Sequence, residues 1–230
     1  MAVALRTPPW NVVLSEVDDP AALGALAAHL ATDPLHGAAD VPGVIGPAEH
    51  ATRFARLWAE RTGALAVHDM TERIFRLTTV RRPWSAPGSK RTATHDDRAL
   101  LVGWFSAFHR EAFGRPMPTD DETMADRWLT LASRTMWLWE VAGDVVSMCG
   151  WGGQTPNGIR IGPVYTPPRL RGRGYASTLV AEASQAALDA GRRFCFLLTD
   201  LANPTSNHIY REIGYEQVRD MKAYMFSVAR

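Results

Sequence analysis

One stretch of the chain, RLRGRGYAS at 169–177, constrains the fold more than any other because it joins a strand pattern to a helix pattern. The run before it, GIRIGPVYTPP (158–168), is strand-like until two prolines end it. The run after it, YASTLVAEASQAALDAG (175–191), is alanine-rich and closes on a glycine. A strand, a glycine-rich loop and a helix in this order predict a βα unit, and therefore an α/β fold.

The loop has the composition of a phosphate-binding loop. Gly172 and Gly174 allow backbone angles forbidden to other residues and let a ligand approach the main chain. The unpaired N–H groups of the following helix would face an anion there, and Arg169, Arg171 and Arg173 add side-chain charge. No lysine follows the glycines as a Walker loop requires, and Ser177 stands where a dinucleotide fingerprint needs glycine or alanine. A surface turn with solvated arginines is the plain alternative.

Composition excludes several classes of function. The chain has 230 residues and is 46% hydrophobic, so it can bury a core, and its formal net charge of +1 argues against a dedicated nucleic-acid binder. The cysteines at 149 and 195 lie in apolar strand-like runs and read as reduced packing residues. We expect no metal, since neither H-x-x-x-H nor CxxC occurs, and no signal peptide or membrane span. The predicted location is the cytoplasm.

The chain divides at RRPWSAPGSKRT (81–92), which reads as a linker. We therefore predict a smaller N-terminal α/β half at 1–80 and a main domain at 93–230. GVIGP and the helix at 47–62 weakly repeat IRIGP and the later helix but lack the arginine-glycine loop, which suggests a degenerate half-repeat.

The pattern of elements predicts a mixed sheet. The front part is expected to hold helices at 20–32 and 47–62 and strands at 64–70 and 73–80. Two helices follow, the second with Thr119 as N-cap, and then two strands joined at AGD (142–144). After the loop and its helix come a strand at RFCFLLTD, a short helix and a final pair of strands at 215–228. Mostly antiparallel strands followed by β-α-β-α-β give a mixed α/β sheet.

A second motif, DLANPTSNHIYREIGY (200–215), forms a strand exit, a short helix and a turn back into a strand. Asn207 and Tyr210 share one face of that helix. A half-buried packing role for the tyrosine is the alternative reading.

Together the two motifs resemble the GNAT superfamily of acyl-CoA-dependent N-acyltransferases over residues 90–226. The family loop Q/R-x-x-G-x-G/A is matched by RGRGYA (171–176), and the later motif N-x-x-[AS]-x-x-x-Y with a G-[FY] turn is matched between Asn203 and Tyr215. The N-terminal half is similar to bacterial members with a degenerate first half. The resemblance implies a GNAT-like fold and acetyl-CoA as the donor, with direct attack of an amine on its thioester.

The resemblance also implies roles for residues. Main-chain N–H groups of the loop would hold the donor's pyrophosphate, the edge of the preceding strand would bind its pantetheine arm, and Asn203 would contact pantetheine. Pro167 lacks one N–H that the strand edge would otherwise offer. The expected donor-binding residues are Val164, Tyr165, Thr166, Arg171, Gly172, Arg173, Gly174, Tyr175, Ala176, Ser177, Asn203, Ser206 and Asn207.

Catalysis by a covalent intermediate is disfavoured because neither cysteine lies in a nucleophile-base setting and no G-x-S-x-G occurs. Tyr210 is the expected acid that protonates the departing thiolate. Glu140 is the first candidate for the base, directly or through water, with Asp200 and His208 as alternatives.

The acceptor stays open between a small amine, an amino acid and a peptide N-terminus, and a homodimer is also left open. The aromatic residues considered for the lining of an acceptor pocket, most of them expected in the core, are Trp104, Phe105, Phe108, Trp128, Trp137 and Trp139. Two other classes compete with the enzyme: a non-catalytic acyl-CoA-binding or regulatory module, and a nucleotide-binding interaction protein.

Overall fold

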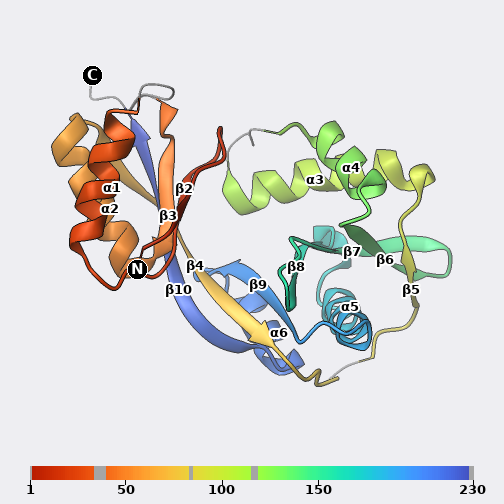
Figure 1. The fold of residues 1–230 in the computed structure, drawn as a ribbon. Coiled ribbons are helices and arrows are strands. Elements are labelled where there is room, and N and C mark those ends of the chain that lie inside the picture. Colours follow the sequence, from red (N-terminus) through yellow and green to blue (C-terminus); the bar gives the residue numbers. More distant parts are fainter. Residues whose placement is uncertain (1, 34–39, 83–84, 115–118, 228–230) are drawn as a thin grey trace. The chain divides into compact units, whose positions relative to one another are not determined.

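The computed structural model describes residues 2–33, 40–82, 85–114 and 119–227. The chain forms two compact units. The first contains Met1–Ile74, Thr199–Ala202 and Val218–Arg230, and the second contains Phe75–Leu198 and Asn203–Gln217. Strands β4 (Leu65–Leu77), β9 (Phe194–Asp200) and β10 (Glu216–Ser227) contribute residues to both (Figure 1).

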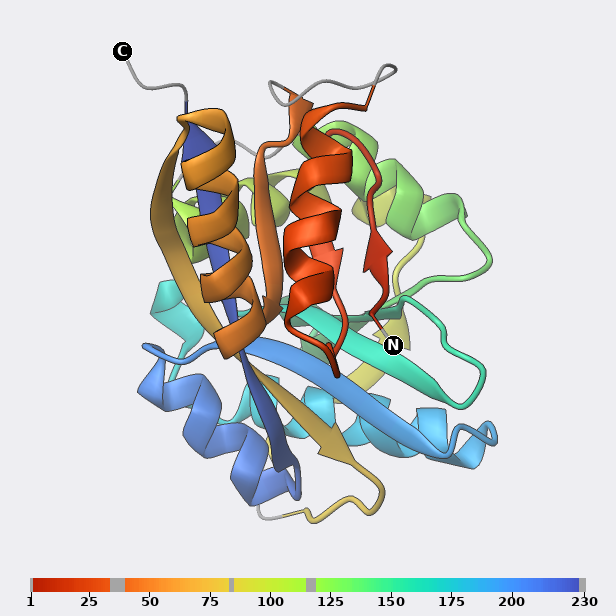
Figure 2. The same ribbon diagram turned by 60° about the vertical axis from the view of Figure 1, so that its left-hand side comes forward.

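In the first unit the strand order is β1-β2-β3-β10-β4, with β1 at Ala4–Leu5, β2 at Val12–Leu14 and β3 at Gly43–Pro47. β3 pairs in parallel with β2 and antiparallel with β10. Helices α1 (Ala21–Ala31) and α2 (Ala48–Thr62) lie side by side against these strands (Figure 2). Phe54 and Trp58, one turn apart on α2, are fully buried in the core of this unit because helical spacing puts both on one face.

In the second unit the order is β4-β9-β8-β7-β6-β5, so the sheet is mixed. Strands β5, β6, β7 and β8 pair with one another in that order and antiparallel, and β8 pairs with β9 in parallel. The bounds are Ser89–Thr92 for β5, Thr135–Val141 for β6, Asp144–Gly152 for β7 and Gly158–Tyr165 for β8. The mixed α/β class and the β-α-β-α-β order expected for this part are confirmed.

Helices cover both faces of this sheet. One core contains residues of α5 (Tyr175–Asp189) and α6 (Pro204–Ile213), and the other contains residues of α3 (Arg98–Phe113) and α4 (Asp121–Thr130). Side chains of a strand point alternately to opposite faces, so Leu138 joins the α3–α4 core and Trp139 the α5–α6 core. Short 3-10 turns at His95–Asp97 and Pro168–Leu170 precede α3 and the glycine loop.

Several boundaries differ from the prediction. The strands expected at 64–70 and 73–80 form the single strand β4, and the final pair of strands is the single strand β10. Polar residues inside both strands suggested turns, but partners satisfy them: Arg73 of β4 forms an ion pair with Asp220 of β10, its Nε 2.7 Å from Oδ1. α4 is capped by Asp120 and not by Thr119, because the Asp120 side chain accepts from the Thr123 N–H at 2.8 Å.

The expected linker at 81–92 is in part a strand. Residues 89–92 form β5, paired with β6, and the Ala86 N–H donates to the Thr178 hydroxyl of α5 at 3.1 Å. Strands are predicted from alternating apolar and polar residues, and this short polar strand at the edge of the sheet lacks that pattern. Residues 83 and 84 of the expected linker lie outside the described residues. In the described part of the chain, no helix is both long and apolar enough to cross a bilayer.

Candidate active site

The glycine loop opens α5, as the sequence predicts. Gly172 and Gly174 adopt positive φ angles of 75° and 80°, and Gly174 is the N-cap of the helix. Within the described residues, the main-chain N–H groups of 172–177 donate no hydrogen bond to the protein. We call residues 171–177 the donor loop. The unpaired N–H groups of 172–177 and the positive end of the helix dipole together favour an anion.

Side chains divide the donor loop into two sets. Arg171 and Arg173 are exposed, whereas Tyr175 and Ser177 are buried in the core of the second unit. The buried pair therefore offers a ligand only main-chain atoms. Ala176 is half-buried between them.

The strand leading into the loop has an unpaired edge. β8 and β9 pair from Gly158 with Phe194 to Arg160 with Phe196, and the pairing ends there, although β8 continues to Tyr165. On its other side β8 stays paired with β7 as far as Tyr165. Residues 161–165, which we call the open edge of β8, therefore have backbone groups available for an extended ligand. Val164 and Tyr165, both predicted in the donor site, lie on this edge, and Thr166 follows it.

The second motif begins α6. The Asn203 side chain caps the helix by accepting from the Ser206 N–H at 3.0 Å, and the Asn207 side chain donates to the Asn203 carbonyl at 2.7 Å. These three polar residues, all predicted in the donor site, are thus joined in the first turn of α6, where they stabilise its start.

Tyr210 lies in the same apolar core as Val164 and Cys149. Its ring contacts Phe75 at 6.2 Å and Tyr215 at 5.8 Å between centroids. Burial, and to a lesser extent Cys149, raises the pKa of the Tyr210 hydroxyl. The group is therefore a neutral phenol, a proton donor, over the whole physiological range. Tyr210 and Tyr175 of the donor loop belong to one hydrophobic core, and Val164 of the open edge packs against it.

Glu140 is committed to an ion pair. Its Oε2 lies 2.7 Å from Nε of Arg91, which also binds Asp97 through its other nitrogens. Glu140 is on β6, two strands from β8, which corresponds to roughly 10 Å between strand axes. Any proton transfer from a substrate at β8 to Glu140 would therefore pass through water.

The two alternative bases, His208 and Asp200, stand on different elements, α6 and the end of β9. His208 is exposed on α6. Asp200 belongs to the first unit, where its Oδ1 accepts from the Ala202 N–H at 2.9 Å in the turn after β9.

Half of the six aromatic residues considered for an acceptor pocket are buried core residues. Phe105, Trp128 and Trp139 are buried. Trp104, Phe108 and Trp137 are only half-buried, and Trp104 contacts Tyr165 at 5.9 Å between ring centroids. Trp104 is thus the aromatic residue adjoining the end of β8.

One residue was missed by the sequence analysis. Glu111, in the last turn of α3, binds both Arg171 of the donor loop and Tyr165 of β8. No motif signals it. Its one unusual feature in the sequence is an acidic side chain near a helix C-terminus.

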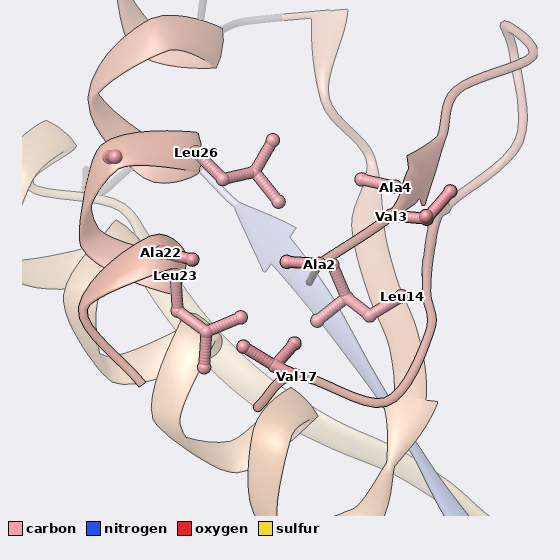
Figure 3. Close-up of a pocket in the computed structure, with 9 residues that line it drawn as sticks. Ala2, Val3, Ala4, Leu14, Val17, Ala22, Leu23 and Leu26 are labelled. Atoms are coloured by element: carbon pink, nitrogen blue, oxygen red, sulfur yellow. The ribbon is translucent and has the colours of Figure 1, made fainter. Parts of the chain in front are cut away.

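An apolar cavity of ≈ 210 Å³ lies in the first unit (Figure 3). Its lining is Ala2, Val3, Ala4, Leu14, Val17, Ala22, Leu23, Ala25 and Leu26. These side chains contain no hydrogen-bonding group, so none of them can bind a phosphate or a thioester through a polar contact.

Comparison with known proteins identifies the family and supports the fold. Residues 99–215 match the family model described as Acetyltransferase (GNAT) family, which is half of the chain. The chain belongs to this family and is an acyltransferase. No curated protein matches it.

Solved structures titled as GNAT acetyltransferases share the fold. A GCN5-related N-acetyltransferase from Sphaerobacter thermophilus is 18% identical with a TM-score of 0.63, covering 100% of this chain and 76% of that one. A GCN5-related N-acetyltransferase from Kribbella flavida is 16% identical with a TM-score of 0.62, covering 94% and 80%. A putative acetyltransferase of the GNAT family from Novosphingobium aromaticivorans is 16% identical with a TM-score of 0.59, covering 97% and 86%.

Proposed function

We propose that the protein transfers an acetyl group from acetyl-CoA to a primary amine by direct attack in a ternary complex. The observation that carries this proposal is the open edge of β8 next to a donor loop with free N–H groups. An extended pantetheine arm carries amide groups that can pair with a strand edge, and a pyrophosphate fits a helix N-terminus. The two features follow each other along the chain, as the two parts do in coenzyme A.

In the proposed reaction the amine nitrogen attacks the thioester carbonyl carbon, the C–S bond breaks, and coenzyme A leaves as a thiolate. Main-chain N–H groups of the open edge would polarise the carbonyl. Pro163 and Pro167 supply none, which leaves Val164, Tyr165 and Thr166 as the donors nearest the end of β8.

Protons move at two points. The Tyr210 hydroxyl donates its proton to the thiolate. Burial raises the pKa of this hydroxyl, so the phenol is protonated at neutral pH but is a weaker acid than a solvated tyrosine. The ammonium form of the amine must lose a proton before attack. Glu140 is our candidate for this step through water, since its Oε2 is already occupied by Arg91.

The test is amine-dependent release of coenzyme A. Purified protein is incubated with acetyl-CoA and a panel of small amines, amino acids and peptides, the thiol is followed with a thiol-reactive dye, and products are weighed by mass spectrometry. We expect thiol release above the amine-free control and a mass gain of one acetyl group on at least one amine. Binding of coenzyme A without release across the panel would favour a non-catalytic module, and binding of ATP or NAD in its place a nucleotide-binding protein.

A further inference from the structure

Glu111 joins three elements of the second unit at the end of the donor site. Its Oε2 accepts from Nη2 of Arg171 at 2.6 Å, and its Oε1 accepts from the Tyr165 hydroxyl at 3.2 Å. The residue stands in the last turn of α3, where the helix dipole disfavours a negative charge. The contact with Arg171 offsets that cost, since a charge-assisted hydrogen bond is stronger than a neutral one.

Arg171 continues the connection into the backbone. Its Nε donates to the carbonyl of Thr166 at 2.8 Å, and its guanidinium carbon lies 5.7 Å from the centre of the Tyr165 ring. Nε and Nη2 are thus committed to groups of the protein. The side chain of Arg171 is therefore bound to the end of β8, and the N–H groups of 172–177, which make no hydrogen bond within the described residues, are left for a ligand.

The end of β8 is also held from β7. The Ser147 hydroxyl donates to the Tyr165 carbonyl at 3.2 Å and lies 2.9 Å from the Thr166 hydroxyl, and both side-chain oxygens are buried. β8 is thus anchored on the β7 side by Ser147 and on the α3 side by Glu111. The turn from Thr166 to Arg171 is fastened through the arginine that Glu111 orients.

We propose that Glu111 is a positioning residue for the acyl donor, which holds Arg171 and Tyr165 so that the open edge of β8 and the donor loop keep a fixed mutual arrangement. The inference rests on the proposed function, because the ligand it serves is coenzyme A. Burial of Tyr165 and the nearby Glu111 carboxylate raise the pKa of the Tyr165 hydroxyl, which keeps that group protonated and able to donate. An exposed ion pair contributes at most a few-fold to an equilibrium, so the expected effect is modest.

The first measurement is coenzyme A affinity by isothermal titration. Glu111→Gln keeps the shape of the side chain and removes its charge, and we expect the Kd to rise about fivefold. Glu122→Gln is the matched control, since Glu122 also pairs with an arginine between two elements, 3.3 Å from Nη2 of Arg98, but touches no donor-site residue. With an amine substrate, the Glu111 variant should raise the donor KM with kcat within twofold of wild type, because the change affects binding and not the reacting atoms.

A double-mutant cycle shows whether Glu111 acts through Arg171. In an Arg171→Gln background, Glu111→Gln should change the Kd by less than twofold, since the charged partner of Glu111 is already gone and only the longer 3.2 Å hydrogen bond from Tyr165 remains. A full fivefold effect in that background would overturn the proposal. An unchanged or lower Kd in the single variant would overturn it too, because Glu111 would then be a bystander or a competitor of the donor.

Hydrogen exchange on the ligand-free protein separates this inference from the proposed function. Amides of Leu170 and Arg171, which donate to the carbonyls of Pro167 and Pro168, should exchange faster in Glu111→Gln than in wild type and Glu122→Gln, whether or not coenzyme A is the ligand. If the wild-type protein fails to bind coenzyme A, the proposed function is contradicted. The hydrogen-exchange comparison still tests whether Glu111 holds the loop, because it needs no ligand. Equal exchange in all three proteins would show that Glu111 does not hold the loop.

Discussion

At the scale of single residues, Tyr210 combines a buried ring with a hydroxyl whose pKa is raised by burial. The same burial that makes it a candidate acid also makes it a packing residue against Phe75 and Tyr215. Removing the hydroxyl alone separates the two roles, because the ring keeps its contacts.

We expect Tyr210→Phe to lower kcat at least tenfold, about 1.4 kcal/mol in the barrier, with the Kd for coenzyme A nearly unchanged. The hydroxyl would act only as the thiolate leaves, so donor binding should not sense its loss. Single-turnover kinetics and titration on one preparation measure both quantities. Wild-type turnover combined with a lower Tm would identify a structural tyrosine.

Gly174 begins α5 at φ 80°, where a β-branched residue is strained, and Gly191 follows the same helix at φ 86°. Valine at either position should cost about 1–2 kcal/mol of stability. Only Gly174→Val should also weaken coenzyme A binding, by tenfold or more, since its side chain would stand where the pyrophosphate approaches the backbone. Titration of the two folded variants tests this, and equal affinities would remove the loop from the donor site.

At the scale of elements, Arg91 fastens β5 to the turn before α3. Its Nη1 and Nη2 lie 2.8 and 2.9 Å from the carboxylate of Asp97, whose Oδ2 also accepts from the Thr94 N–H at 2.8 Å. These hydrogen bonds hold the pKa of Asp97 below its usual value, and the hydrogen bond from Arg91 has the largest effect. A carboxylate with a lowered folded-state pKa stabilises the fold above its unfolded pKa and loses this effect as the pH falls through the folded value.

We therefore expect Asp97→Asn to lower the unfolding free energy at pH 7 by about 2 kcal/mol. The difference from wild type should begin to shrink below about pH 4, the unfolded pKa of aspartate, and vanish below the folded value. Urea denaturation of both proteins at pH 7 and near pH 3 measures it. A difference independent of pH would mean that the charge of Asp97 contributes nothing.

Elements with a strong local signal were predictable. The glycine loop, α5 and the start of α6 follow from Gly172, Gly174 and Asn203, because each needs a particular backbone conformation or cap. Strand β5 and the continuity of β4 and β10 were not predictable from the sequence. The polar residues in these strands are satisfied by partners far along the chain, as Arg73 is by Asp220. Glu111 escaped for the same reason, because its partner Arg171 lies 60 positions away.

At the scale of the whole molecule, sequence order and compact units do not coincide. The second unit begins at Phe75, before the boundary expected at 93, and the first unit uses residues 218–227 of β10. Phe75 and Leu77 are fully buried in the α5–α6 core.

A fragment of residues 93–230 should therefore fail to fold. It lacks Phe75 and Leu77, each worth about 1.5–3 kcal/mol when buried, against a typical total stability of 5–15 kcal/mol. Circular dichroism and gel filtration, with the full chain as reference, measure the outcome. A monomeric fragment with cooperative unfolding would establish 93–230 as an independent domain.

The first unit should bind no donor of its own. α2 begins at Ala48 directly after β3, without the glycine loop that precedes α5. We expect one coenzyme A per chain by isothermal titration. A stoichiometry near two would show that the N-terminal half has kept a site.

The open edge of β8 has a consequence for the protein when no ligand is bound. Unused N–H and C=O groups along a strand are the surface on which foreign strands add and aggregates grow. A pantetheine arm lying along residues 161–165 would cover these backbone groups. Bound coenzyme A would therefore also protect the enzyme against self-association. We expect the protein to stay soluble longer when it is stored with coenzyme A than without it.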